Sequence, residues 1–204
     1  MRLSKARKEC VTAMMRDTIF EAASSVVDKH GTAGLTMDRV ASTVGLATGS
    51  LYNYFDGKSD LLQFFYTRLV EPFFQPIEEI ARTELSAPQK LERILHAAWE
   101  HAVKYKGLIR LFVAGDQRAA IRRDTRPRLL RILTAIFKQG IREGTLVPRN
   151  PAHMGRMFHG CLSELFDLVA EGARNDELNE YVAVLIDATI KGFSIRPENA
   201  PESN

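Results

Sequence analysis

Residues 35–58 constrain the fold of this 204-residue chain most, because they combine two short helical patterns with a tight turn. Thr36 can cap the first helix, and Val40 and Val44 share an apolar face at helical spacing. Gly45 stands where a helix ends in the left-handed conformation, which glycine adopts at little cost. The segment therefore predicts a helix-turn-helix unit.

The second helix predicted in this segment has one apolar face and one hydrogen-bonding face. Leu51 and Phe55 are four residues apart and are expected to point inward. The other face has no acidic residue and carries Thr48, Gly49, Ser50, Tyr52, Asn53 and Tyr54. A helix in a DNA major groove needs little bulk near the backbone and donors toward phosphates and base edges. The pattern is typical of a DNA-recognition helix.

Residues 45–55, followed by Lys58 and residues 61–62, strongly resemble the DNA-binding domain of the TetR family of bacterial transcriptional regulators. The resemblance is close over roughly residues 11–65, and beyond them only a helical outline fits. One departure is Ala47, where many members carry a serine, and Thr48 could take over the capping or phosphate contact. The resemblance implies a repressor that a small-molecule effector releases from a palindromic operator.

The resemblance also implies roles for individual residues of the module. Thr48, Ser50 and Asn53 would face bases, and phosphates would be held by Thr36, Tyr52, Tyr54 and Lys58. The expected DNA-binding set is Lys5, Thr36, Met37, Thr48, Gly49, Ser50, Tyr52, Asn53, Tyr54 and Lys58. Operator DNA is thus one expected partner.

The N-terminal segment is basic although the net charge of the chain is only +3. Within residues 1–16, Glu9 is the one acid beside Arg2, Lys5, Arg7, Lys8 and Arg16. Such an arm can follow a phosphate backbone or enter a minor groove. The alternative is a solvated terminus, and the neighbouring helix-turn-helix favours the DNA interpretation.

The remainder of the chain shows helical periodicity and no convincing strand alternation. One helix is expected over about 11–29. Another begins at Lys58, with a kink or break near residues 71–72 because Pro72 and Pro76 lack amide donors. Further helices are expected at about 86–106, 107–115, 125–144, 150–172 and 177–193. These patterns predict an all-α protein of about nine helices.

The expected organisation is an N-terminal three-helix helix-turn-helix module, residues 1–57, and a C-terminal effector-binding and dimerisation domain, residues 58–195. Residues 196–204 are expected to form a disordered tail. Large apolar side chains in the second domain are either plain core or, as the resemblance implies, the wall of a cavity for a small, mainly apolar effector. The candidates are Phe65, Trp99, Phe112, Phe137 and Phe158. Ligand binding there would move the helix that begins at Lys58 and change the spacing of two recognition helices.

A homodimer is expected, because a single recognition helix reads only a few base pairs. The last two helices are apolar on more than one face, so a partner subunit could cover the second face. The interface candidates are Met154, Phe158, Leu162, Leu165, Leu185 and Thr189. The alternative is that both helices lie deep in the core of one subunit.

Other functions have little support in the sequence. It has no glycine-rich phosphate loop, no serine elbow and no metal-ligand spacing, so no enzyme activity, cofactor or metal is expected. A ligand-independent architectural DNA-binding protein is the main alternative, and an all-α enzyme is less favoured. The arginines between residues 118 and 131 form either a solvated face or a site for an anionic effector or a second DNA contact.

The expected location is the cytoplasm. Cys10 and Cys161 are far apart in the sequence and match no redox spacing, as in a reduced cytoplasmic protein. No apolar run approaches the roughly 20 residues of a membrane span, and the N-terminus lacks the apolar stretch of a signal peptide.

Overall fold

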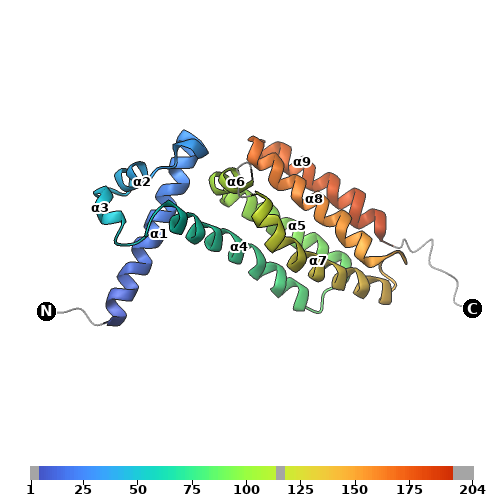
Figure 1. Ribbon diagram of the computed structural model, residues 1–204. Coiled ribbons are helices and arrows are strands. Elements are labelled where there is room, and N and C mark those ends of the chain that lie inside the picture. Colours follow the sequence, from blue (N-terminus) through green and yellow to red (C-terminus); the bar gives the residue numbers. More distant parts are fainter. Residues whose placement is uncertain (1–4, 114–117, 195–204) are drawn as a thin grey trace, which may run out of the picture.

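The computed structural model describes residues 5–113 and 118–194, and within these ranges the protein is all-α (Figure 1). The predicted fold class is therefore confirmed. A three-helix module lies at one end of the molecule, and the remaining helices form a bundle. The nine α-helices are α1 (Lys5–His30), α2 (Met37–Val44), α3 (Thr48–Leu51), α4 (Lys58–Arg82), α5 (Ala87–Lys104), α6 (Lys106–Val113), α7 (Arg118–Arg142), α8 (Pro151–Glu171) and α9 (Asn175–Leu185).

The helix-turn-helix forms as its local sequence predicts. The Thr36 hydroxyl accepts a hydrogen bond of 3.2 Å from the Arg39 amide and so caps α2. Gly45 ends α2 with φ of 81°, a left-handed conformation in which a side chain would be strained. Leu51 and Phe55 are both buried. The turn chemistry thus sets the angle at which α3 leaves α2.

Helix α1 begins earlier than predicted, at Lys5, and its first turns project away from the rest of the molecule (Figure 1). Residues 5–14 are all exposed, and burial starts only at Ile19. Val11, at the predicted start of this helix, is 48% exposed. No other helix in the described ranges covers this part of α1.

A kink or break is predicted near residues 71–72, and the chain does not break there, since helix α4 is continuous from Lys58 to Arg82. Pro72 and Pro76 both lie inside it. Contacts on either side of the prolines hold the helix together. Arg128 of α7 donates to Glu71 Oε1 at 3.0 Å and to Glu78 Oε1 at 2.9 Å. Tertiary packing therefore offsets the hydrogen bonds that each proline removes.

Helix α7 begins at Arg118, seven residues before the predicted start, and Pro127 lies inside it rather than in its first turn. Helix α8 agrees with the prediction, since the Asn150 side chain caps its start and left-handed Gly172 ends it. The last helix is only partly α-helical: α9 ends at Leu185, and residues 186–191 continue as a π-helical turn.

The hydrophobic core is one continuous cluster that joins the small module to the bundle. Phe20 of α1 packs on Phe65 of α4, with ring centroids 5.5 Å apart, and on Tyr105 at 6.2 Å. Gly107 of α6 lies against the Ser24 carbonyl of α1, where an added Cβ would approach to 3.0 Å. Both α4 and α6 therefore connect the two parts.

The structure does not test the predicted domain boundary or the predicted tail. The boundary expected between residues 57 and 58 falls at the start of α4, but the continuous core does not by itself divide the chain there. The tail expected at residues 196–204 lies outside the described residues. In the described ranges, no helix is both long and apolar enough to cross a membrane.

Candidate functional site

The predicted DNA-binding residues all lie on the surface or at its edge. Lys5 is at the exposed start of α1, and Thr36 and Met37 are at the start of α2. Lys58 is exposed in the first turn of α4. The remaining six, on α3 and the turn after it, are Thr48, Gly49, Ser50, Tyr52, Asn53 and Tyr54, none of which is buried.

The recognition helix itself is shorter than predicted. Helix α3 ends at Leu51, and residues 52–54 continue as a turn. In that turn the Asn53 amide donates to the Ser50 carbonyl at 3.2 Å. Ala47 occupies the N-cap position and no side chain caps the helix, so the Thr48 hydroxyl does not take over capping. That hydroxyl is left for a contact outside the chain.

Arg16 fixes the end of the recognition turn, a role that the sequence pattern did not reveal. Its guanidinium donates two hydrogen bonds to the Tyr54 carbonyl, at 3.1 and 2.7 Å. The same group lies 4.8 Å from the Phe55 ring centroid and 5.5 Å from that of Phe64. Arg16 thus joins α1, the recognition turn and α4. Its basic charge suggested only DNA contact, because its partners are 38 or more residues away in sequence.

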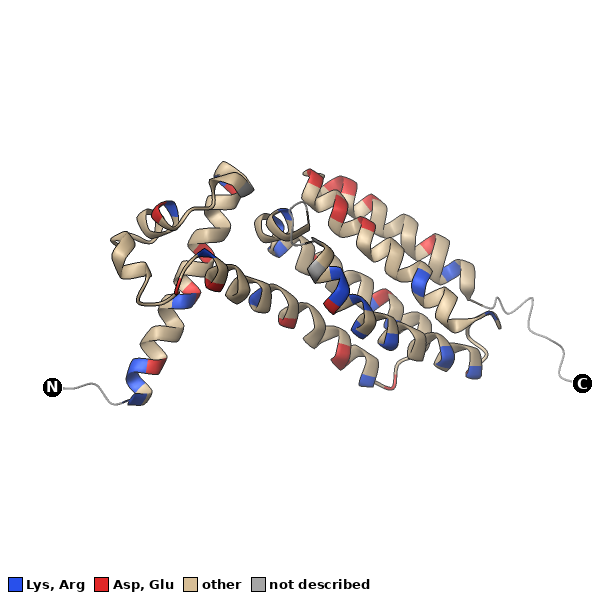
Figure 2. Ribbon diagram, in the orientation of Figure 1, with Lys and Arg blue, Asp and Glu red and all other residues tan. Residues whose placement is uncertain are grey.

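Charge is unevenly distributed over the molecule (Figure 2). Basic residues gather at the start of α1 and along α7, whereas acidic residues gather where α8 ends and α9 begins. Arg128 is the member of the α7 group that is built into the fold, with two carboxylate partners and the Phe74 ring 4.2 Å away. The side chain of Arg118, which belonged to the predicted arginine cluster, lies outside what the structure describes.

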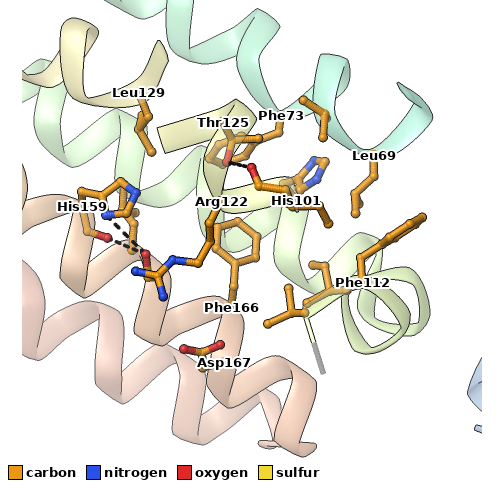
Figure 3. Close-up of a pocket in the computed structure, with 16 residues that line it drawn as sticks. Leu69, Phe73, His101, Phe112, Arg122, Thr125, Leu129, His159, Phe166 and Asp167 are labelled. Carbon is orange, nitrogen blue, oxygen red and sulfur yellow. Dashed lines mark hydrogen bonds between the residues drawn. The ribbon is translucent and has the colours of Figure 1, made fainter. Parts of the chain in front are cut away.

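A cavity of about 120 Å³ lies within the bundle, between helices α4 to α8 (Figure 3). Its wall is mainly apolar, and α4 contributes Leu69 and Phe73. Phe112 comes from α6 and Phe166 from α8. Each of the five helices that form the cavity wall packs against others of the five, so the shape of the cavity depends on how they are arranged.

The five predicted cavity residues do not come together around this space. Phe112 lines the cavity, whereas Phe65 packs on Phe20 at the junction with α1. Phe137 and Phe158 pack on each other, with centroids 6.2 Å apart, in the core between α7 and α8. Trp99 is half-buried elsewhere on α5, and its Nε1 is buried without a hydrogen-bond partner. The cavity expectation is therefore corrected for these four residues.

Two histidines in the cavity wall have perturbed proton affinities. Burial, with a smaller contribution from Lys104, lowers the pKa of His101 to about 4. Burial also lowers the pKa of His159, and the nearby charges of Arg126 and Arg122 lower it further. Both rings are therefore neutral at pH 7.

The predicted dimer-interface residues are also corrected by the structure. Each is buried within one chain, with exposed fractions of 6% or less: Met154, Phe158, Leu162, Leu165, Leu185 and Thr189. They pack α8, α9 and the π-helical turn after α9 onto the bundle, so little of their surface is left for a partner to cover. The alternative of a monomer core explains these positions. The helical faces themselves still have exposed apolar residues, namely Met157 at 45% and Val184 at 56%.

Metal chemistry has no cluster to support it in the described ranges, where no three His, Cys, Asp or Glu residues gather as a metal site would require. Cys10 and Cys161 are both free thiols.

The chain resembles known proteins in sequence and in fold. Residues 19–63 match the family described as bacterial regulatory proteins, tetR family. A TetR-family transcriptional regulator from Pectobacterium atrosepticum has the same fold, with a TM-score of 0.67 and 22% identity over 96% of this chain and 100% of that one. Residues 19–63 are therefore similar to the DNA-binding module of the TetR family, and the whole chain shares the fold of the solved regulator.

The TetR-family relatives match over limited parts of their length. The HTH-type transcriptional repressor DrrR1 of Streptomyces coeruleorubidus is 40% identical over 62 residues, which are 30% of this chain and 23% of DrrR1. An HTH-type transcriptional regulator of Staphylococcus aureus is 26% identical over 103 residues, 50% of this chain and 56% of that protein. These relatives are transcriptional regulators and not enzymes, in agreement with the sequence prediction.

The Arg16 contacts predict a specific mutational effect on this TetR-family module. Arg16→Met removes both hydrogen bonds to the Tyr54 carbonyl and should lower the free energy of unfolding by about 1–3 kcal/mol. Arg16→Lys should restore only part of it, because an ammonium lacks the planar fork. Urea unfolding followed by circular dichroism measures this. Arg123→Lys, at an exposed site on α7, is the control, and equal stability of all three variants would contradict the assigned role.

Burial of His101 predicts a pH-dependent stability. Between about pH 6.5 and 4 the unfolded chain binds a proton at this residue and the folded chain does not, so stability falls as the pH falls through that window. The slope contributed is about 1.4 kcal/mol per pH unit. Urea unfolding at pH 7.5, 6 and 5 should show a larger loss for the wild type than for His101→Phe. Parallel losses in the two proteins would show that His101 is not the cause.

Proposed function

We propose that this chain is a DNA-binding transcriptional regulator of the TetR type, a repressor that leaves a palindromic operator in the bacterial cytoplasm when a small, mainly apolar effector binds. The observation that carries the proposal is the pairing of an exposed recognition helix with a largely apolar cavity, joined through α4 and α6. The alternative of an architectural DNA-binding protein without a ligand leaves that cavity without a purpose.

The DNA contacts are assigned by position in the module. Thr48, Ser50 and Asn53, on α3 and its turn, face the bases in this proposal. The phosphate contacts come from the starts of α2 and α4 and from the turn after α3. The residues are Thr36, Lys58, Tyr52 and Tyr54. Lys5, on the projecting start of α1, follows the backbone or enters the minor groove beside it. Met37 and Gly49 shape the surface between these contacts.

Effector binding can reach the DNA-binding module along two helices. Helix α4 contributes Leu69, Val70 and Phe73 to the cavity and carries Lys58 at its other end. Helix α6 contributes Phe112, and its Gly107 lies against α1. A ligand that favours the arrangement incompatible with DNA weakens DNA binding tenfold for about 1.4 kcal/mol of coupling.

The proposed dimer uses the outer faces of α8 and α9. Helices α8 and α9 pack side by side, and the Tyr181 hydroxyl of α9 donates to the Cys161 carbonyl of α8 at 3.1 Å. Met157 of α8 and Val184 of α9 are large apolar side chains that are exposed on these two helices. A second copy of the chain would cover them, and a two-fold pair would present two recognition helices to successive major grooves.

The DNA-binding proposal is tested by separating phosphate contacts from base contacts. Lys58→Ala should weaken binding to operator and random DNA alike and reduce the salt slope by about one. Asn53→Ala should reduce preference for the operator, by about 1–3 kcal/mol for a bidentate contact. Fluorescence anisotropy on an operator selected from random duplexes, over a range of salt, measures both. Equal losses on both DNAs for both variants would refute the assignment.

The dimer proposal is tested at Val184. Val184→Glu places a charge on the proposed interface without touching the core, so dimer dissociation should rise at least tenfold, a change of about 1.4 kcal/mol. Val11→Glu, at a comparably exposed apolar site on α1, is the matched control and should leave the dimer intact. Sedimentation velocity at micromolar concentration is the measurement. A wild-type monomer under these conditions would overturn the proposal.

A further inference from the structure

The cavity wall has two polar regions within its apolar lining (Figure 3). Arg122 reaches toward His159, whereas His101 lies among Leu69, Phe73 and Phe112. A ligand in a cavity of this kind is oriented by the few polar groups that its wall presents. The two regions therefore carry information about the chemistry of the ligand.

The Arg122 region favours an anion. Among the described residues, none forms an ion pair or hydrogen bond with the Arg122 guanidinium. Arg126 adds a second positive charge close enough to act on His159. Asp167 also lines this wall, but it has an interaction of its own. Arg122 is an exposed residue at the edge of this apolar space, and its planar guanidinium matches a carboxylate, which can accept two parallel hydrogen bonds.

The His101 region favours a neutral hydrogen-bonding group. The side chain is 8% exposed and its ring packs on Tyr105 and Phe73, with centroids 4.7 and 5.4 Å away. No described residue makes a hydrogen bond to it. A neutral imidazole presents one donor and one acceptor, which a hydroxyl group can satisfy together. A ligand hydroxyl that pairs with this imidazole in a largely apolar surrounding gains a hydrogen bond and so gains affinity.

We propose that the effector is a small apolar carboxylic acid, with its carboxylate on Arg122 and a hydroxyl or similar neutral polar group on His101. The proposal rests on the effector cavity of the proposed function and adds the chemical class of the ligand. An engineered cavity of about 150 Å³ holds benzene, so one ring is a suitable size for the apolar body. Ser163, whose hydroxyl donates to the His159 carbonyl at 3.0 Å, lies beside the carboxylate position.

Four matched probes test the class of ligand by isothermal titration calorimetry on the full chain. The first is 3-(4-hydroxyphenyl)propionate. In the second and third, its carboxylate is replaced by a primary alcohol or a primary amine. The fourth is 3-phenylpropionate, which lacks the ring hydroxyl. The hydroxylated acid should bind at least tenfold tighter than the alcohol or the amine, as expected for a charge-assisted hydrogen bond. It should also bind severalfold tighter than 3-phenylpropionate. Equal or weaker binding of the hydroxylated acid relative to the alcohol or amine overturns the proposal, as does the absence of binding by all four.

Variants locate the two contacts. Arg122→Gln should remove the advantage of the acid over the alcohol, whereas Arg123→Gln, the adjacent exposed arginine on α7, should keep it. His101→Phe should make the two acids bind equally. An unchanged acid preference in Arg122→Gln overturns the carboxylate assignment. If His101→Phe does not fold, the wild-type comparison of the two acids decides whether the hydroxyl contributes.

Operator binding measured on the same preparations separates this proposal from the proposed function. Intact operator binding with no preference for the acid shows that the ligand class is wrong and the regulator proposal survives. Preferential acid binding without any specific DNA binding supports the ligand class and contradicts the regulator proposal.

Discussion

The packing of α4 against both parts of the molecule is the contact on which the rest of the structure depends. Near its start, Leu61 and Phe65 are buried against the helix-turn-helix module, and farther along Phe74 and Ile77 are buried in the bundle. Each such side chain contributes about 1.5–3 kcal/mol when fully buried. One helix therefore holds the recognition surface and the cavity in a defined relation, and neither part can rearrange without disturbing it.

Two arginines stabilise α4 at opposite ends, each by a planar group that donates hydrogen bonds and stacks on aromatic rings. Arg16 connects its start to the recognition turn, and Arg128 holds its second half across Pro72 and Pro76. Because both contacts are directional, they favour one orientation of the helix rather than merely burying it. This geometry explains how a helix with two prolines remains continuous between the cavity and the helix-turn-helix module.

Features that depend on neighbouring residues could be predicted from the sequence, and features that depend on distant ones could not. The caps of α2 and the inward positions Leu51 and Phe55 follow from residues within a few turns of one another, so they could be predicted. The cavity could not, because an aromatic side chain on a buried face gives no sign of whether empty space or another ring adjoins it. Phe112 and Phe137 have the same pattern in the sequence, yet one lines the cavity and the other packs on Phe158.

The sequence by itself determined the fold class, the helix-turn-helix and the surface position of its polar face, because helical period, capping and glycine turns act over short distances. Only the tertiary structure decided which apolar residues are core, cavity or surface. Met154 and Met157 differ by three residues on α8, but one is buried and the other exposed. That difference depends on which neighbouring helices cover each side of α8, and these come from distant parts of the chain.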